Sequence, residues 1–395
     1  MPLSHGINQT KNNQKMKSLI YLLLSAVLLL SCKPKASHTS GNSENAEKVT
    51  LSQALNGKFL IGTALNMNQI NGQRPDEIKE VKTNFNSIVA ENCMKSGSLV
   101  PTQGKYDFTD ADKFVAFGEE NKMVIHGHTL IWHSQTPKWF FKDSLGKEVA
   151  RDELINRMKN HINTVVTRYK GRVNTWDVVN EAVLDDGSLR KSKFYTIIGE
   201  DFIKLAFEFA HEADPDAELY YNDYSTSNRK KRDGIVRLVK SLKENGVPIH
   251  GVGMQGHIGL DNPEIEEFEK SIIAFSDLGV KVSITEFDIT VLPSPWDNQG
   301  AEVSANFEYQ EKMNPYSKGL PDSVSTVFNK RCLDYFKLFL KHEDKIDKVN
   351  MWGVNDGDSW LNNWPVRGRT DYPLIFDRNN NPKAVVDSII RIVNN

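Results

Sequence analysis

Residues 173–183, VNTWDVVNEAV, have the composition of a buried β-strand yet carry strongly polar side chains, two of them acidic. The four valines and Trp176 suit a strand, because β-branched and aromatic side chains pack well on a pleated surface. Asp177, Asn180 and Glu181 lie in the same run, and an uncompensated carboxylate in a core costs on the order of several kcal/mol. We therefore expect Glu181 to stand where the strand leaves the core, and Asp177 to lie on the strand's other face or in a buried pair.

Similar apolar runs recur along the chain and alternate with amphipathic stretches. Residues 151–171 and 229–246 place apolar side chains at helical spacing, and each of these stretches ends at a glycine. Strands that alternate with helices predict a parallel sheet, and eight such units over about 345 residues predict an α/β fold with a single (β/α)8 TIM barrel. A doubly wound open sheet is the structural alternative. The other seven predicted strands are 59–64, 87–90, 123–131, 218–221, 251–255, 280–285 and 349–354.

Polar and aromatic residues gather where seven of the eight predicted strands end. An active site in such a barrel is built at the carboxyl ends of the strands. Carboxylates and amides mixed with aromatic rings are typical of carbohydrate sites, because rings cover C–H surfaces and polar groups bind hydroxyls. The segments are AENCMK, HGHTLIWHSQ, VVNEA, YYNDY, GMQGHI, ITEFD and WGVNDGDSW.

Two glutamates occupy matching positions, Glu181 after the fourth predicted strand and Glu286 after the seventh. Hydrolysis of a glycosidic bond needs two carboxyl groups: one protonates the leaving oxygen, and the other attacks the sugar or activates water. His257 and Asp288 lie close to Glu286 in the predicted barrel, and a histidine between two carboxylates favours an ionised Glu286. We therefore expect Glu286 to be the nucleophile and Glu181 the proton donor and acceptor. The alternative is that both are rim acids in ordinary ion pairs.

Several other classes of function are disfavoured by the sequence. The formal net charge of −2 offers no electrostatic basis for binding nucleic acid. His126 and His128 form an HxH pair that can bind a divalent metal, but the other strand ends lack the further ligands that such a site needs. We expect no metal and no cofactor, and structural hydrogen bonds for His126 and His133. A serine nucleophile is also unsupported, since the chain has no GxSxG motif.

The N-terminus predicts export rather than a folded domain. Residues 1–32 contain a basic start, a short apolar core and Leu29-Leu30-Ser31-Cys32, which is typical of a signal peptide with a bacterial lipobox. We expect lipid attachment at Cys32 and a bacterial lipoprotein at the cell surface or in the periplasm, with the lipid as the only membrane contact. An ordinary signal peptide is the alternative, and Met16 is an alternative start. Residues 33–48 predict a flexible polar tether, and residues 49–395 the catalytic domain, which we expect to be monomeric.

Two cysteines remain after Cys32. Cys93 and Cys332 could form a disulfide in an exported protein, but we favour two buried free thiols.

Taken together, the quoted segments resemble glycoside hydrolase family 10, whose typical members are endo-β-1,4-xylanases. The resemblance runs from about residue 51 to residue 393, with every motif in the family's order. It implies a (β/α)8 barrel, xylan and xylo-oligosaccharides as substrates, and a retaining double displacement. Alternatives are another retaining β-glycosidase acting on β-glucan, and a glycan-binding protein without catalysis, against which the presence of both acids argues.

The resemblance also implies a role for each matching residue. Glu181 matches the family's acid/base and Glu286 its nucleophile. The segment over residues 291–330 is long, includes Trp296 and borders the cleft, so the resemblance does not predict the number of sugar-binding subsites. The other matches are Glu91, Asn92 and Lys95 as glycone-side contacts, His128, Trp132, Asn180 and Gln255 around the cleaved sugar, His257 and Asp288 as supports of the nucleophile, Trp352 and Trp360 as cleft walls, and Tyr224 as a leaving-side stacking residue.

Overall fold

The computed structural model of the protein describes residues 49–294 and 310–394. The predicted signal peptide, the lipidation site at Cys32, the tether over residues 33–48 and Trp296 lie outside the described residues, so these four assignments stay predictions.

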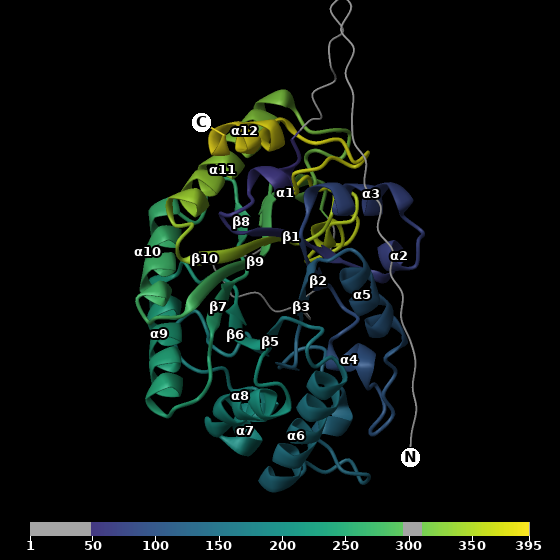
Figure 1. Ribbon diagram of the computed structural model, residues 1–395, viewed down its shortest axis with the longest axis vertical. Coiled ribbons are helices and arrows are strands. Elements are labelled where there is room, and N and C mark those ends of the chain that lie inside the picture. Colours follow the sequence, from purple (N-terminus) through teal and green to yellow (C-terminus); the bar gives the residue numbers. More distant parts are fainter. Residues whose placement is uncertain (1–48, 295–309, 395) are drawn as a thin grey trace, which may run out of the picture. The chain divides into compact units, whose positions relative to one another are not determined.

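Eight parallel strands close into a barrel, as the alternating pattern predicts. Their order around the ring is β1, β2, β3, β5, β6, β7, β9 and β10, and pairing of β10 with both β9 and β1 closes it (Figure 1). The open-sheet alternative is therefore wrong. The strands are β1 (Leu60–Leu65), β2 (Ser87–Ala90), β3 (Val124–Gly127), β5 (Thr175–Asn180), β6 (Glu218–Asp223), β7 (Gly251–Met254), β9 (Lys281–Thr290) and β10 (Ile346–Met351).

The third predicted strand is shorter than its apolar run suggests. The run over residues 123–131 is divided into β3 and a two-residue strand, β4 (Ile131–Trp132), which pairs with β5. Between them, the Thr129 hydroxyl and the Leu130 amide both donate to the carbonyl of Asp177, at 2.9 and 3.0 Å. The chain turns at these bonds instead of continuing the ladder. A further short strand, β8 (His257–Gly259), pairs in parallel with the last residues of β9, from Asp288 to Thr290.

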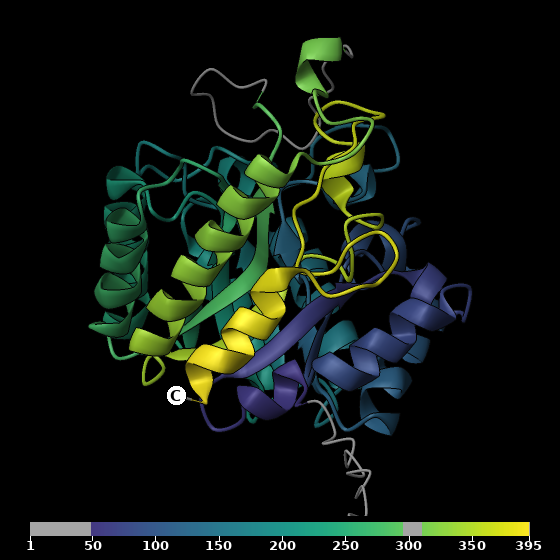
Figure 2. The same ribbon diagram turned by 90° about the horizontal axis from the view of Figure 1, so that it is seen from above.

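Helices surround the barrel on its outside, as Figures 1 and 2 show. Figure 2 shows α11 and α12 lying alongside each other against the strands. The described helices are α1 (Leu51–Ala54), α2 (Met67–Ile70), α3 (Pro75–Asn84), α4 (Ser96–Leu99), α5 (Thr109–Glu120), α6 (Arg151–Arg168), α7 (Lys193–Ile198), α8 (Asp201–Ala213), α9 (Arg229–Glu244), α10 (Ile265–Ser276), α11 (Asp322–Lys341) and α12 (Ala384–Val393), with the 3-10 turns η1 (Lys138–Phe140), η2 (Glu311–Met313) and η3 (Trp360–Asn362).

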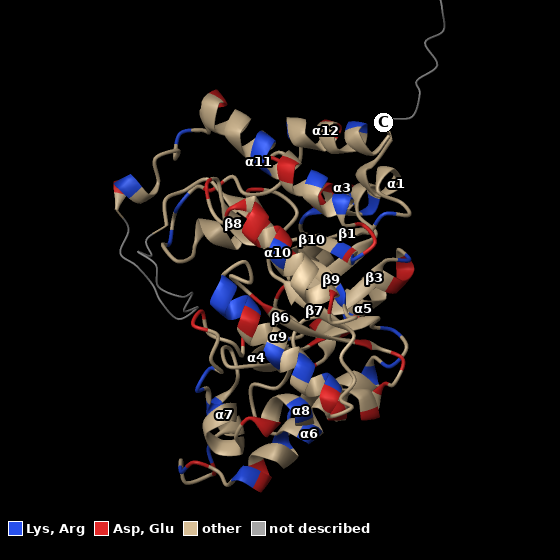
Figure 3. Cartoon of the chain, turned by 90° about the vertical axis from the view of Figure 1, so that its left-hand side faces the viewer, with Lys and Arg blue, Asp and Glu red and all other residues tan. Residues whose placement is uncertain are grey.

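The two helices predicted from periodicity are present, α6 and α9. In α6 the acids Asp152 and Glu153 occupy the first turn and Arg168 the last, where each charge is favoured by the helix dipole. Asn228 caps α9 by accepting from the Lys230 amide at 2.9 Å. Figure 3 shows acidic and basic residues interspersed along the outer helices, in keeping with a net charge near zero.

The opening stretch of valines and tryptophan packs in the core as expected. Trp176 is fully buried, and its ring lies against Gly127 of β3, where any side chain would collide with it.

Cys93 and Cys332 are buried and unpaired, which confirms the prediction of free thiols, and burial raises the pKa of each to about 12. None of the helices within residues 49–294 and 310–394 has both the length and the apolar composition to cross a bilayer.

Candidate active site

Each predicted catalytic glutamate lies at or just after an irregularity in its strand. On β5 the pairing with β6 shifts between Asp177 and Val179, so β5 holds one extra residue there. On β9 the pairing with β10 shifts between Ile284 and Phe287, again with one extra residue. Such bulges re-aim side chains and are common beside active sites. Glu286 lies inside β9, because this strand runs farther than the predicted one, whereas Glu181 directly follows β5 as predicted.

The backbone bends sharply at Glu181. Its φ of +58° lies in the left-handed region, which non-glycine residues rarely adopt. The bend confirms the prediction that Asn180 and Glu181 need an irregular strand end to enter one site. Both side chains contact Gln255, whose amide nitrogen lies 3.0 Å from Glu181 Oε1 and 3.5 Å from Asn180 Oδ1.

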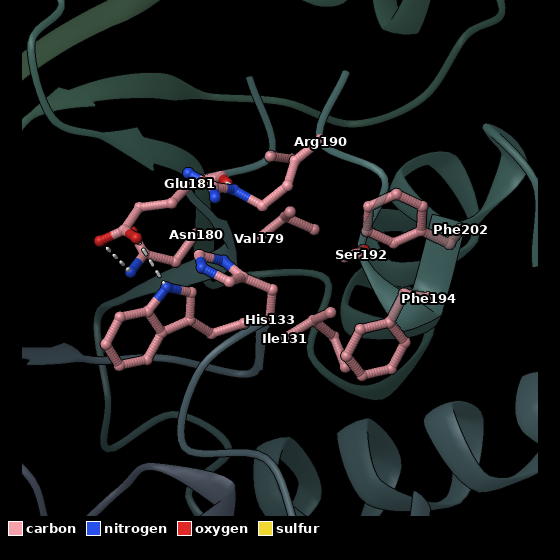
Figure 4. A pocket seen from close by; sticks show the side chains of 11 residues that line it. Ile131, His133, Val179, Asn180, Glu181, Arg190, Ser192, Phe194 and Phe202 are labelled. Atoms are coloured by element: carbon pink, nitrogen blue, oxygen red, sulfur yellow. Dashed lines mark hydrogen bonds between the residues drawn. The ribbon is translucent and has the colours of Figure 1, made fainter. Parts of the chain in front are cut away.

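The Glu181 carboxyl is buried and held by three neutral donors. Trp132 Nε1 donates to Oε2 at 2.9 Å, while Gln255 Nε2 and Asn180 Nδ2 donate to Oε1 at 3.0 and 3.4 Å. Burial raises the pKa of Glu181, and the charge of nearby Asp223 raises it further. Figure 4 shows the carboxylate pointing toward Asn180 and away from Phe194 and Phe202, which line a small cavity behind the bend. Glu181 is therefore suited to hold a proton.

Glu286 is equally buried but has a charged partner. His257 Nε2 lies 3.1 Å from Oε2, and Asn222 Nδ2 donates to Oε1 at 2.8 Å. On its other side, His257 Nδ1 lies 3.0 Å from Asp288 Oδ1. Burial opposes ionisation of both Glu286 and His257, but the two carboxylates raise the pKa of His257 to about 10. The hydrogen bond from His257 and attraction to His128 and His257 bring the pKa of Glu286 below its ordinary value.

Asn222 connects the two acids and was missed by the sequence analysis. Its Nδ2 donates to Glu286 Oε1 and, at 3.1 Å, to Asn180 Oδ1, while Thr285 Oγ1 donates to its Oδ1 at 2.6 Å and fixes the orientation of the amide. A chain of amides therefore runs from one carboxyl group to the other. The sequence does contain a signal for this role, because Asn222 lies near the carboxyl end of β6, within the segment YYNDY, where barrel active sites are built.

Asp177 lies in a buried cluster with the two histidines of the HxH pair. Its Oδ2 is 2.8 Å from His128 Nδ1 and its Oδ1 is 3.0 Å from His126 Nε2. Burial opposes the charge of Asp177, but the two histidines bring its pKa below the ordinary value. The cluster accounts for the acid in the opening stretch and for the HxH pair: His126 in β3 and His128 directly after that strand hold one carboxylate. The predicted structural role of His126 agrees with this contact.

The residues predicted to contact the glycone sugar form a connected group beside Glu181. Lys95 Nζ donates to Asn92 Oδ1 at 3.0 Å, and Asn92 Nδ2 donates to Glu91 Oε1, also at 3.0 Å. Lys95 Nζ also lies 5.1 Å from the centroid of the Trp132 ring, over its face. Burial lowers the pKa of Lys95, and attraction to Glu286 and Glu91 opposes that change. Lys95 thus lies within electrostatic range of Glu286.

Aromatic side chains flank the two carboxyl groups. Trp352 lies edge-on to both His128 and His257, with ring centroids 5.5 and 6.4 Å apart. Trp360 donates from Nε1 to Asp288 Oδ2 at 2.9 Å and stacks on Trp364, a further aromatic that the sequence analysis did not single out. Through these contacts, the interactions that join Glu286, His257 and Asp288 reach Trp352 and Trp360, the residues predicted to form the walls of the cleft.

The predicted leaving-side residue, Tyr224, is more enclosed than a free stacking platform. It is only 7% exposed, and its hydroxyl accepts from Arg190 Nη2 at 2.8 Å. Lys231 Nζ lies 3.2 Å from the ring centroid, beneath one face. Lys231 therefore occupies one face of this ring. Within residues 49–294 and 310–394, no group of three or more histidine, cysteine or acidic side chains is arranged to hold a metal ion.

Comparisons with known proteins agree with this geometry. The family described as "Glycosyl hydrolase family 10" matches residues 50–392. The sequence is 52% identical over 343 residues to endo-1,4-beta-xylanase A of Xylanibacter ruminicola, covering 87% of this chain and 93% of that protein. A GH10 endoxylanase from a sugarcane soil metagenome has a similar structure, with a TM-score of 0.84, 48% identity, and coverage of 87% of this chain and 99% of that chain. An intracellular xylanase of Thermoanaerobacterium saccharolyticum, determined as a variant with xylotriose, gives a TM-score of 0.75 and 34% identity over 87% of this chain and 99% of that chain.

Proposed function

Because the chain belongs to glycosyl hydrolase family 10, we propose that it is an endo-1,4-β-xylanase. It hydrolyses internal β-1,4-xylosidic bonds of xylan by a retaining double displacement, with Glu286 as nucleophile and Glu181 as acid/base. One observation carries this assignment: two equally buried glutamates, joined by a chain of amides, have pKa values moved in opposite directions. Opposed pKa values separate an acid from a nucleophile. The xylanase relatives support xylan as the substrate.

In the first step the ionised Glu286 carboxylate attacks the anomeric carbon. The bond to the leaving oxygen breaks, and Glu181 gives its proton to that oxygen, so a covalent glycosyl-enzyme forms. The imidazolium of His257 stabilises Glu286 before attack, and Asp288 holds that charge in place. Asn222 fixes the other carboxylate oxygen, so the orientation of the nucleophile is set from two sides.

In the second step water replaces the departed leaving group. Glu181, now ionised, takes a proton from this water, which attacks the anomeric carbon while the bond to Glu286 breaks. The hydrogen bonds from Trp132 and Gln255 stabilise the charge that Glu181 carries between the two steps. Two inversions at one carbon return it to the original β configuration.

The first prediction concerns the substrate and the stereochemistry. Incubation with unbranched xylan should release new reducing ends, and proton NMR in the first minutes should show the β-anomer before mutarotation. Barley β-glucan is the control polymer for the alternative glycosidase. Release from β-glucan but not xylan would favour another retaining β-glycosidase, binding without release would favour a glycan-binding protein, and initial α-anomer would exclude a retaining mechanism.

The second prediction concerns pH. Because the pKa of Glu286 is lowered, the nucleophile stays ionised at a more acidic pH than an ordinary glutamate would. Because the pKa of Glu181 is raised, the acid keeps its proton to a higher pH than usual. The value of kcat/KM for an aryl β-xylobioside should therefore rise as Glu286 ionises and fall at higher pH as Glu181 loses its proton. A profile with only one of these limbs between about pH 3 and pH 9 would contradict the assignment.

A further inference from the structure

The strained backbone at Glu181 is held by side chains from neighbouring segments. Of the three amides that follow β5, only that of Glu181 donates to the main chain, to the Asn222 carbonyl at 2.9 Å. The amides of Ala182 and Val183 both donate to the hydroxyl of Tyr221, at 3.0 and 2.9 Å. A single hydroxyl therefore binds two consecutive buried N–H groups directly after the acid/base, and the Val183 amide has a second, longer contact of 3.4 Å to Asp223 Oδ2.

The hydrogen-bonding capacity of the Tyr221 hydroxyl is fully used. A phenol has one hydrogen to donate and two lone pairs. The hydrogen goes to Asp223 Oδ2, which leaves both lone pairs for the two amides. The other carboxylate oxygen, Asp223 Oδ1, accepts from Lys231 Nζ at 2.8 Å and from the Tyr224 amide at 2.9 Å. Tyr221, Asp223 and Lys231 are all fully buried.

We propose that the Tyr221 hydroxyl, oriented by Asp223 and Lys231, is a positioning group that holds Glu181 where it can protonate the leaving oxygen. The inference rests on the proposed function. The left-handed conformation of Glu181 is unfavourable for a residue with a Cβ, and such a conformation persists only where the surrounding structure imposes it. The Tyr221 hydroxyl imposes this conformation by binding the amides of Ala182 and Val183. Relaxation of the bend would break these hydrogen bonds to buried N–H groups.

The arrangement separates support of the acid from support of the nucleophile. Tyr221 contacts the segment that carries Glu181, whereas Glu286 is held by Asn222 and His257. Loss of the hydroxyl should therefore weaken acid catalysis and leave nucleophilic attack intact. The loss in rate should therefore be larger for a leaving group that needs a proton than for one that departs without it.

The experiment compares Tyr221→Phe with wild type on two aryl β-xylobiosides. Phenol is a poor leaving group that needs a proton, whereas 2,4-dinitrophenol needs none. The variant should lower kcat/KM for the phenyl substrate by roughly 10-fold to 100-fold, part of the 10²–10⁴-fold that general acid catalysis contributes, and change the dinitrophenyl value by less than about 3-fold. Tyr220→Phe is the matched control: Tyr220 is the adjacent residue on β6, is equally buried, and its hydroxyl donates to Asp347 at 2.7 Å.

A double-mutant cycle with Glu181→Ala decides whether Tyr221 acts through the acid. In the Glu181→Ala background, Tyr221→Phe should cost nothing further on the phenyl substrate, because the group that it positions is gone. An equal loss on both aryl substrates, or an unchanged loss in the Glu181→Ala background, would overturn the proposal. Wild-type enzyme that cleaves neither aryl substrate nor xylan would instead contradict the proposed function, so the two failures are distinguishable.

A second variant tests the same network without leaving a buried charge unpaired. Asp223→Asn combined with Lys231→Met removes both charges, so the hydrogen of the Tyr221 hydroxyl loses its carboxylate acceptor and keeps at most a neutral amide oxygen as partner. The leaving-group-dependent loss should have the same direction as in Tyr221→Phe. A folded double variant with wild-type values on both aryl substrates would overturn the role of Asp223 and Lys231.

Discussion

Replacing Glu286 by alanine is expected to abolish xylan hydrolysis, with a loss in kcat on the order of 10⁴-fold to 10⁶-fold, as for the removal of other covalent nucleophiles. Asp288, two residues farther along β9, is not expected to take its place, since it is engaged by His257 and Trp360. The reducing-end assay on xylan measures the loss. Glu218→Ala is the control, because Glu218 begins β6 at the opposite end of the barrel from the site.

The Glu286→Ala variant should be partly rescued by azide. The truncated side chain leaves space beside Asn222 and His257, and a small anion there can attack an activated fluoride or dinitrophenyl glycoside once. A single displacement inverts the anomeric carbon, so the product should be the α-glycosyl azide. Rescue that yields the β-azide, or full activity of the variant on xylan, would assign the nucleophile to a different residue.

Replacing Glu181 by alanine is expected to give losses that depend on the leaving group. Xylan, whose leaving oxygen needs a proton, should lose roughly 10²-fold to 10⁴-fold in kcat/KM, the usual contribution of a general acid. A dinitrophenyl β-xylobioside should keep nearly its full kcat/KM, because its leaving group departs without a proton. Its kcat should fall, since the second step has lost its base and the glycosyl-enzyme accumulates.

Azide distinguishes the two glutamates by stereochemistry. In Glu181→Ala it replaces water at the glycosyl-enzyme, raises kcat, and should yield the β-glycosyl azide after two inversions. Opposite azide anomers from the two variants would therefore assign both roles in one experiment. Glu181→Gln is the matched control, since it keeps the volume and one oxygen that can accept from Trp132 or Gln255 but has no acidic proton to give. Equal loss on every substrate would argue against an acid role for Glu181.

The barrel was predictable because its signals are local. Each strand is a short apolar run, each helix a periodic one, and parallel strands place their carboxyl ends at one edge whatever the loops do. The interruption between β3 and β4 was missed, since Leu130 and Ile131 continue the apolar run and only bonds to Asp177 on another strand turn the chain there. The length of β9 was also missed, because Glu286 and Asp288 look like loop residues until their partners are known.

The sequence by itself determined the fold class, the two glutamates and most of the side chains around them, because strand ends can be located from hydrophobic pattern alone. Only the tertiary structure decided what those side chains do to one another. The opposed pKa values of Glu181 and Glu286, the pairing of Asp177 with two histidines, and the bridging role of Asn222 all arise from contacts between different strands. Desolvation and charge act over a few ångströms in space, so residues far apart in sequence set these properties jointly.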